Sequence, residues 1–595
     1  MKHLSPQFIR WAALAIVATH TALLAWSAYR QSPTRNEVAH LVAGISDWQF
    51  GRFDVYRVNP PLSRLVAAIP VLLSHPKTNW ERFVARPGAR PELALGKDFI
   101  AANRERSLWL YTIARWACIP FSWLGAWICF LWARQLNGEA ASLLALTLWC
   151  FCPNIIANAQ LVTPDAAATA FGLAASYCFW RWLKTPTFSS AFFTGVALGL
   201  AQLTKFTWLL LFILWPMLWI VSRSTASHFR TNPRRLLFEA GQLGVAVLLS
   251  CYVINLGYGF DGAFQRLRDF RFVSDALAEP ETADGDALRQ SGTNRFTKSW
   301  FGAIPVPFPR HFVLGFDLQK RDLEHFPQQS YLRGRFQQSG WWYFYLYALA
   351  IKVPLGFWLL LVVALLATRF IPSPKERPNW RDRLVLLAPG VAVLTLVSTQ
   401  THFTIHSRYV LPALPYAFIW MSRLATVFCS GPTIVRTIAA AGLTWGIASS
   451  LWIYPHSLSY FNEMIGGPNN GHSHLLDSNI DWGQDLVFLR DWVDRHSDAR
   501  PLHIAYVGSF DPADVGVSDD ASMPAKPDIG SMIRKEGLED AWYAISVDYL
   551  HGNAPLSPVG HNKWDLLSPA AASHFLMMRP TERVGYSIYI FHVRR

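Results

Sequence analysis

The sequence has few charged residues. Asp, Glu, Lys and Arg make up 16% of its 595 residues, whereas soluble globular proteins contain about 25%. Hydrophobic residues make up 52% and are gathered into long runs. This pattern excludes an ordinary soluble chain and indicates a polytopic membrane protein.

Cysteine is also scarce. The chain has 7 cysteines, all of them in or beside apolar runs: Cys118, Cys129, Cys150, Cys152, Cys178, Cys251 and Cys429. The polar segments contain none, which excludes a disulfide framework and a cysteine metal knuckle. The sequence also has no internal repeat and no low-complexity tract.

Positive charge is in excess, with a formal net charge of +14. The Lys and Arg residues fall mainly in short loops between apolar runs, which is the distribution that the positive-inside rule describes. The excess therefore indicates a lipid bilayer as partner and argues against nucleic acid.

Long apolar runs predict about eleven transmembrane helices. The runs lie near 8–30, 107–133, 138–152, 164–183, 190–204, 206–222, 236–256, 341–368, 383–400, 408–425 and 432–453. The first run is too long for a signal-peptide core and has no clear cleavage site, so we expect it to be retained. With the N-terminus in the cytoplasm, every compact basic loop falls on the inner side.

Three large polar segments then share the outer side: 31–106, 257–340 and 454–595. We expect a transmembrane module over 1–453, with the first two segments as its large outer loops. An extracytoplasmic α/β domain follows over 454–595. The sequence predicts an amphipathic helix over 484–496 and strands over 502–508, 541–550 and 586–593. A short apolar stretch over 60–73 predicts an amphipathic helix at the membrane interface. The expected location is the inner (plasma) membrane, with the active site on the periplasmic or extracellular side.

Ionisable residues lie at the outer ends of the predicted spans, and Lys352 lies within the eighth. Charge is costly within a span, so each of these residues is a candidate functional residue. They are Glu37, Asp165, Lys205, Lys352, His402, His406 and Arg408. Each also has a structural interpretation. Lys205 and Arg408 would be interface anchors, Asp165 a helix-start acid and Lys352 an internally paired cation. Glu37 would be a loop acid, and the histidines polar packing.

Together these groups favour one chemistry. Arg and Lys bind a lipid phosphate strongly at close range, and a carboxylate serves as a general base for an acceptor hydroxyl. A sugar donor linked to a lipid phosphate needs both, because its phosphate lies at the interface and its sugar lies in water.

The order of several motifs carries a family resemblance. They are NEVAHLVAG (36–44), GRFDVY (51–56), NPPL (59–62), LVTPD (161–165), LTK (203–205), IKVP (351–354), RYVLPALP (408–415) and FNEMIGGPNNGHSHLLDSNIDWGQDL (461–486). In this order they resemble the GT-C superfamily of polyprenyl-phosphate-sugar-dependent glycosyltransferases. The branch is similar to the protein O-mannosyltransferases and the lipid A aminoarabinose transferase.

The resemblance implies an inverting transfer of a sugar, hexosyl or mannosyl in type, from a polyprenyl-phosphate carrier to an acceptor that is a protein, a lipid or a glycan. Glu37 and Asp165 would be catalytic, with Glu37 as the base and Asp165 assisting or holding a metal. The residues expected to bind the substrate or its phosphate are Lys205, Lys352, Arg408, His406, His40 and Asn59. Dependence on a divalent metal cofactor varies across the superfamily, and the sequence contains no ligand cluster that identifies a metal.

Two positions depart from the family pattern. Asn36 stands where relatives carry an acid that is often assigned as the base, and Asn59 stands where they carry His before Pro-Pro. Asn cannot act as a general base, so the role passes to Glu37, or the acceptor differs, or the enzyme is impaired. The alternative functions are a lipid-linked-sugar transporter or flippase and a non-catalytic membrane scaffold.

Overall fold

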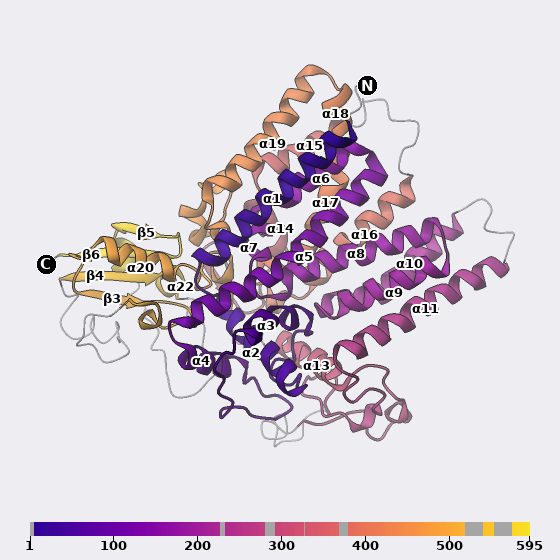
Figure 1. Ribbon diagram of the computed structural model, residues 1–595, viewed down its shortest axis with the longest axis horizontal. Coiled ribbons are helices and arrows are strands. Elements are labelled where there is room, and N and C mark those ends of the chain that lie inside the picture. Colours follow the sequence, from indigo (N-terminus) through magenta and orange to yellow (C-terminus); the bar gives the residue numbers. More distant parts are fainter. Residues whose placement is uncertain are drawn as a thin grey trace.

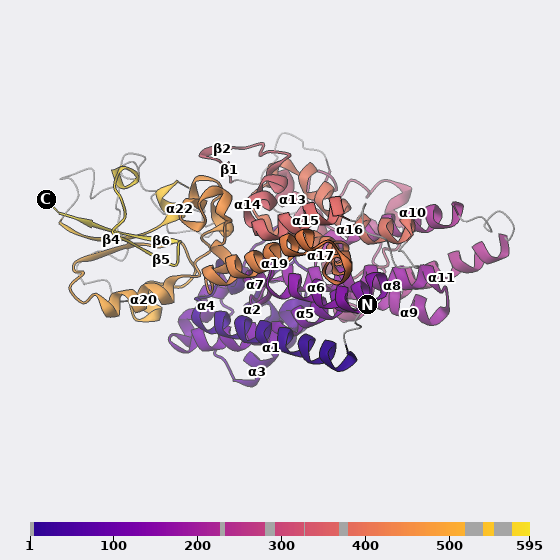
Figure 2. The same cartoon turned by 90° about the horizontal axis from the view of Figure 1, so that it is seen from above.

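A computed structural model describes residues 5–225, 233–279, 292–325, 328–367, 379–517, 540–552 and 574–594. Long helices run roughly side by side, and a small sheet lies at one end of the molecule (Figure 1). The view from above shows the sheet standing beside the helical body (Figure 2).

Helices lie in all of the predicted apolar runs. They are α1 (Pro6–Arg30), α5 (Arg106–Asn137), α6 (Glu139–Cys150), α7 (Pro153–Ala159), α8 (Pro164–Lys184), α9 (Phe188–Gln202), η1 (Phe206–Leu209), α10 (Leu210–Ser224), α11 (Pro233–Gly257), α14 (Phe344–Lys352), α15 (Leu355–Ala367), α16 (Trp380–Thr399), η6 (Ser407–Ala413), α17 (Leu414–Met421), η7 (Ser422–Leu424), α18 (Ala425–Ser430) and α19 (Thr433–Ile453). The polytopic helical prediction is confirmed.

The predicted count of eleven spans is not confirmed. In the described part of the chain, seven helices are long and apolar enough to cross a membrane, or up to nine if each of two bent pairs is one span. The α6–α7 pair bends by 61° and the α14–α15 pair by 105°. Pro153 and Pro354 stand at these breaks, and proline disfavours helical geometry in the residue before it. Helix α9 has only 15 residues, fewer than the roughly 20 that a span needs.

Residues 31–106, predicted as the first outer loop, fold into three short helices, α2 (Arg35–Phe50), α3 (Leu62–Leu73) and α4 (Glu92–Asn103). Gly51 follows the last residue of α2 as its C-terminal cap, and its φ of 60° suits glycine. Gly44 permits close packing of α2 on α3, because a Cβ there would lie 2.2 Å from the Arg64 carbonyl oxygen. Helix α3 occupies the apolar piece predicted over 60–73.

The second outer loop contributes η3 (Leu267–Asp269), η4 (Trp300–Ala303), α13 (Arg310–Glu324) and the hairpin β1 (Ser330–Leu332) with β2 (Arg335–Gln337). A short turn, η5 (Thr401–Phe403), follows α16 and leads to η6. Helix α13 lies at the same end of the helical body as α2 and α3 (Figure 1).

The C-terminal segment is α/β, as predicted. It contains η8 (Ser457–Ser459), η9 (Glu463–Ile465), η10 (Pro468–Ser473), η11 (Asp477–Asn479), α20 (Leu486–Arg495), β3 (Leu502–Ala505), η12 (Pro512–Val515), β4 (Ala541–Ser546), α22 (Val547–Leu550), β5 (Glu582–Val584) and β6 (Ile588–Val593). The sheet order is β3-β4-β6-β5, with β3 parallel to β4 and the other pairs antiparallel. Strand β5 was not predicted, because three residues carry no clear alternation.

One buried cluster joins the first outer loop to the C-terminal segment. Val38 of α2 and Leu110 of α5 belong to the same cluster as Leu486 of α20, Ile504 of β3 and Ile590 of β6. This shared core fixes the C-terminal segment against α2. The division of the chain at residue 453 stays a prediction.

Candidate functional site

A cavity of about 1320 Å³ lies where the outer loops meet the ends of the helices. Its walls come from α2, the start of α8, the η1–α10 junction, the end of α13, the end of α16, the start of η6, and the C-terminal segment. Segments that are far apart in the sequence therefore meet at this cavity. Of the predicted site residues, the cavity is lined by His40, Asn59, Asp165, Lys205, His406 and Arg408.

Two cations share one carboxylate in this cavity. Lys205 Nζ lies 2.7 Å from Asp165 Oδ1, and Arg408 Nε lies 3.5 Å from Asp165 Oδ2. The Arg408 guanidinium also lies over the Trp482 ring at 4.0 Å, and Lys205 Nζ over the Tyr409 ring at 4.4 Å. These contacts hold both cations in place. Lys205, Arg408 and Asp165 together carry one net positive charge.

One flank of the cavity is apolar. Leu209 lines it at the end of η1 and Leu210 and Ile213 from α10, while Leu396 and Val397 line it from α16. Both helices are among those long and apolar enough to cross a membrane. Ile213 is 70% exposed, so this flank continues onto the apolar outer surface of the helices.

The opposite flank is acidic and comes from the C-terminal segment. Asp477, Asp481 and Asp548 line it beside Trp482. Asp477 Oδ1 lies 3.0 Å from His406 Nδ1. Burial tends to raise the pKa of Asp477, but His406, the Ser478 N–H and Arg408 hold that pKa well below its usual range.

Backbone hydrogen bonds fix this acidic flank against the start of α2. The Arg35 N–H donates to the Trp482 carbonyl at 3.1 Å, and the Ser32 N–H donates to the Gln484 carbonyl at 3.0 Å. Asn36, the next residue after Arg35, lines the same cavity. The position that departs from the family pattern therefore adjoins the acidic segment.

His40 and Asn59 line the cavity near Tyr56. The His40 ring packs edge-on against Tyr56, with ring centroids 4.7 Å apart. Burial, with the charge of Arg64 acting in the same direction, lowers the pKa of His40 to about 3. His40 is therefore neutral at pH 7 and contributes hydrogen bonding rather than charge to the cavity.

Glu37 does not lie where the predicted base role requires. It is fully buried and is absent from the cavity wall. Arg115 Nε donates to its Oε1 at 2.8 Å and Arg115 Nη2 to its Oε2 at 2.6 Å. The N–H groups of Thr34 and Val162 donate to the same carboxylate. Both oxygens are thus occupied, and this geometry favours a structural role that ties α2 to α5.

Lys352 also lies outside the cavity wall. Its Nζ donates to the carbonyls of Leu458 at 2.8 Å and Asn479 at 2.5 Å, and lies over the Phe461 ring at 4.4 Å. Lys352 therefore supports the segment that carries Asp477 and Asp481, rather than facing the cavity. The side chain of His402 lies outside the described residues.

Several residues of the cavity wall were not predicted. They include Arg35, Arg90, Asp477, Asp481, Trp482 and Asp548. The DSNIDWGQDL motif was the available signal for three of them, since it carries acids and an aromatic residue in the stretch that carries the resemblance. Its place in the polar C-terminal segment gave no reason to put it beside Arg408.

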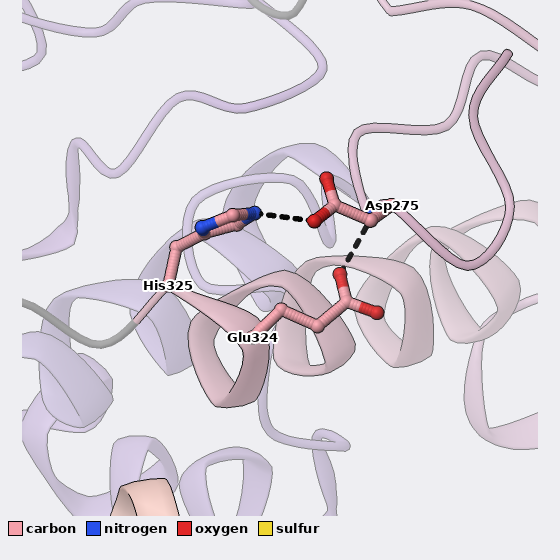
Figure 3. Close-up of side chains that lie close together, drawn as sticks. All are labelled: Asp275, Glu324 and His325. Atoms are coloured by element: carbon pink, nitrogen blue, oxygen red, sulfur yellow. Dashed lines mark hydrogen bonds and ion pairs between the residues drawn. The ribbon is translucent and has the colours of Figure 1, made fainter. Parts of the chain in front are cut away.

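The described residues include one group with the spacing of metal ligands, Asp275, Glu324 and His325, whose ligand atoms lie within 4.8 Å of one another (Figure 3). His325 Nε2 lies 2.7 Å from Asp275 Oδ2, and the Asp275 N–H donates to Glu324 Oε2 at 2.7 Å. All three residues line the cavity. Carboxylate and imidazole groups suit a divalent cation, but two of the three side chains are exposed and already pair with each other.

Comparisons with known proteins agree with the motifs. Residues 111–253 match the model of the dolichyl-phosphate-mannose-protein mannosyltransferase family. This match confirms the predicted resemblance to the protein mannosyltransferases over a segment that begins within α5 and ends within α11. A comparison with curated proteins finds no match.

Two crystal structures of ArnT from Cupriavidus metallidurans align with 97% of this chain and 97% of their own. The form bound to undecaprenyl phosphate gives 13% identity and a TM-score of 0.42. The apo form gives 14% identity and a TM-score of 0.28.

Proposed function

We propose that this chain is a membrane glycosyltransferase of the GT-C type that moves a sugar from a polyprenyl-phosphate carrier to an acceptor hydroxyl, with inversion at the anomeric carbon. The family match favours mannose or a related hexose as the sugar. The positive-inside distribution favours the extracytoplasmic side for the reaction.

The observation that carries this proposal is the pairing of an apolar flank with two cations in one cavity. Leu210 and Leu396, from helices able to span a membrane, lie on the flank, and Lys205 and Arg408 line the same cavity. A polyprenyl tail fits the flank, and the phosphodiester of a lipid-linked sugar carries one negative charge. The one net positive charge of the Lys205–Asp165–Arg408 group complements it.

Chemically, the acceptor oxygen attacks the anomeric carbon while the bond from that carbon to the phosphate oxygen breaks. The leaving polyprenyl phosphate gains negative charge, which Lys205 and Arg408 stabilise. Asp165 keeps the two cations apart and oriented through its two oxygens. His406 joins Asp477 to the same wall, and His40 and Asn59 supply neutral hydrogen-bonding groups.

Purified full-length chain in proteoliposomes tests the proposal. We expect cleavage of one member of a panel of radiolabelled polyprenyl-phosphate sugars, beginning with dolichyl-phosphate mannose, with release of polyprenyl phosphate. Arg408→Ala should abolish most of this cleavage, whereas Arg436→Ala, at an exposed position on α19, should not. Movement of intact carrier across the bilayer without cleavage would identify a transporter instead.

A further inference from the structure

We infer that the Asp481 carboxylate is the general base of this transferase and accepts the proton of the acceptor hydroxyl. The inference rests on the proposed function and deepens it, because it assigns the proton acceptor that the sequence leaves vacant at Asn36.

The structure, like the sequence, shows no proton acceptor at position 36. Asn36 lines the cavity, but its amide cannot take a proton at neutral pH. Glu37, the adjacent acid, is turned away and bonded to Arg115. A base must therefore come from another part of the cavity wall.

Most acids of the wall already have a cationic neighbour. Asp165 pairs with Lys205 and Arg408, and Asp477 with His406. Arg90 pairs with Glu92 and Asp322, Lys320 with Glu324, and His325 with Asp275. Asp548 interacts with the Arg35 charge. A carboxylate paired with a cation is a weak proton acceptor, because the cation stabilises its charged form.

Asp481 differs from these acids. Among the residues that the structure describes, none forms an ion pair with it. Its Oδ1 accepts a hydrogen bond from the Gly483 N–H at 3.2 Å. Its Oδ2 receives no hydrogen bond of ordinary geometry from a described residue, although the residue is only 1% exposed and the Ser546 hydroxyl and the Asp548 N–H lie near the carboxylate. An unpartnered buried carboxylate oxygen is costly, which is consistent with a partner that arrives with the substrate.

Its position suits the acceptor side of the reaction. The following residue, Trp482, lies under the Arg408 guanidinium at 4.0 Å and is bonded through its carbonyl to the Arg35 N–H. Asp481 is therefore adjacent in sequence to Trp482, which positions Arg408, the expected phosphate-binding cation. It also lies on the same cavity wall as Asn36. The same cavity brings the phosphate site and this carboxylate together.

The acidity of Asp481 supports the assignment. Burial raises its pKa to about 7 and the nearby Asp485 charge acts in the same direction, whereas the Gly483 N–H, the Ser546 hydroxyl and the Asp548 N–H oppose the rise. A general base works best when its pKa lies near the working pH. The other groups that face Asp481 are Asp548 and the hydroxyls of Ser546, Tyr506, Tyr549 and Tyr589.

The step balances without a further reactant. The acceptor oxygen forms a bond to the anomeric carbon as its proton passes to the Asp481 carboxylate. The carbon–oxygen bond to the phosphate breaks, and its electron pair leaves with the polyprenyl phosphate. The proton on Asp481 then returns to water after the products depart.

The test compares Asp481→Asn with wild type and with Asp494→Asn, a change at an exposed acid on α20. We expect Asp481→Asn to lower kcat by about 10²–10⁴-fold, the usual effect of losing a general base. Its affinity for undecaprenyl phosphate and its thermal unfolding temperature should match wild type, because Asp481 is not expected to bind the phosphate. Asp494→Asn should change none of these quantities.

The pH dependence and a rescue variant separate a base from a structural residue. Wild-type kcat should rise with pH to a plateau above about pH 7, since only the ionised carboxylate accepts a proton, and Asp481→Asn should lose this rise. Adding Asn36→Asp to Asp481→Asn should recover part of the lost turnover. If Asp481→Asn fails to assemble, the wild-type profile decides, and a profile without that rise overturns the inference.

The two proposals fail in different ways. An active wild type whose turnover survives Asp481→Asn overturns the base assignment alone. A wild type that cleaves no lipid-linked sugar overturns the proposed function, and the base assignment falls with it.

Discussion

At the scale of single residues, the buried pair of Glu37 and Arg115 decides how α2 is held. Removing one partner of a buried pair leaves an uncompensated charge and costs about 3–5 kcal/mol. We therefore expect Glu37→Gln to lower stability by that amount, measured by unfolding in detergent. Glu139→Gln, in the exposed pair with Arg134, should cost at most about 1 kcal/mol. Unchanged stability with turnover abolished would restore Glu37 as the base.

Arg408 is the second residue whose role is measurable by itself. Arg408→Ala should weaken binding of undecaprenyl phosphate by about 2–4 kcal/mol, the scale for removing a partner of a desolvated charge. Arg408→Lys should recover only part, because an ammonium group cannot reproduce the fork of a guanidinium. Titration calorimetry measures both, with Arg436→Ala as the control. Equal affinities in all variants would make Arg408 an interface anchor.

At the scale of elements, the break between α14 and α15 places a cation under the C-terminal segment. Lys352, the last residue of α14, donates to the Leu458 and Asn479 carbonyls. A charged hydrogen bond contributes about 1.5–3 kcal/mol, so we expect Lys352→Met to weaken the attachment of that segment. Turnover should then fall by about tenfold or more, and limited proteolysis near residue 479 should become faster. Lys77→Met, at an exposed position, is the control. Lost turnover with unchanged proteolysis would instead favour direct action on the substrate.

At the scale of the whole molecule, the outer loops and the C-terminal segment gather at one end of the helices, whereas α18 and the N-terminal end of α1 lie at the other (Figure 1). We predict that Ala513→Cys, beside Asp514 in a background with Cys429→Ser, reacts with an impermeant thiol reagent in intact cells. The exposed native Cys429 of α18 should react only after permeabilisation. The reverse pattern would invert the orientation and move the cavity to the cytoplasmic side.

The sequence by itself determined the membrane class, the positions of the helices and much of the cavity, including Asp165, Lys205 and Arg408. These follow from the local apolar runs and from motif order, since a helix in lipid must satisfy its own backbone within one segment. The short strand β5 and the two broken spans could not be predicted from the sequence, because tertiary packing decides which short strands form and where helices bend.

Only the tertiary structure shows where Glu37, Lys352 and Asp481 lie and which groups they contact. Glu37 meets Arg115 at a separation of 78 residues, and Lys352 meets Asn479 at 127. Asp481 reaches the cavity through backbone bonds between its neighbours and residues 32–35. Local periodicity indicates which face of a helix is apolar, but not which distant charge lies opposite a carboxylate. Whether an acid is a base or half of an ion pair depends on that partner, and only the folded chain supplies it.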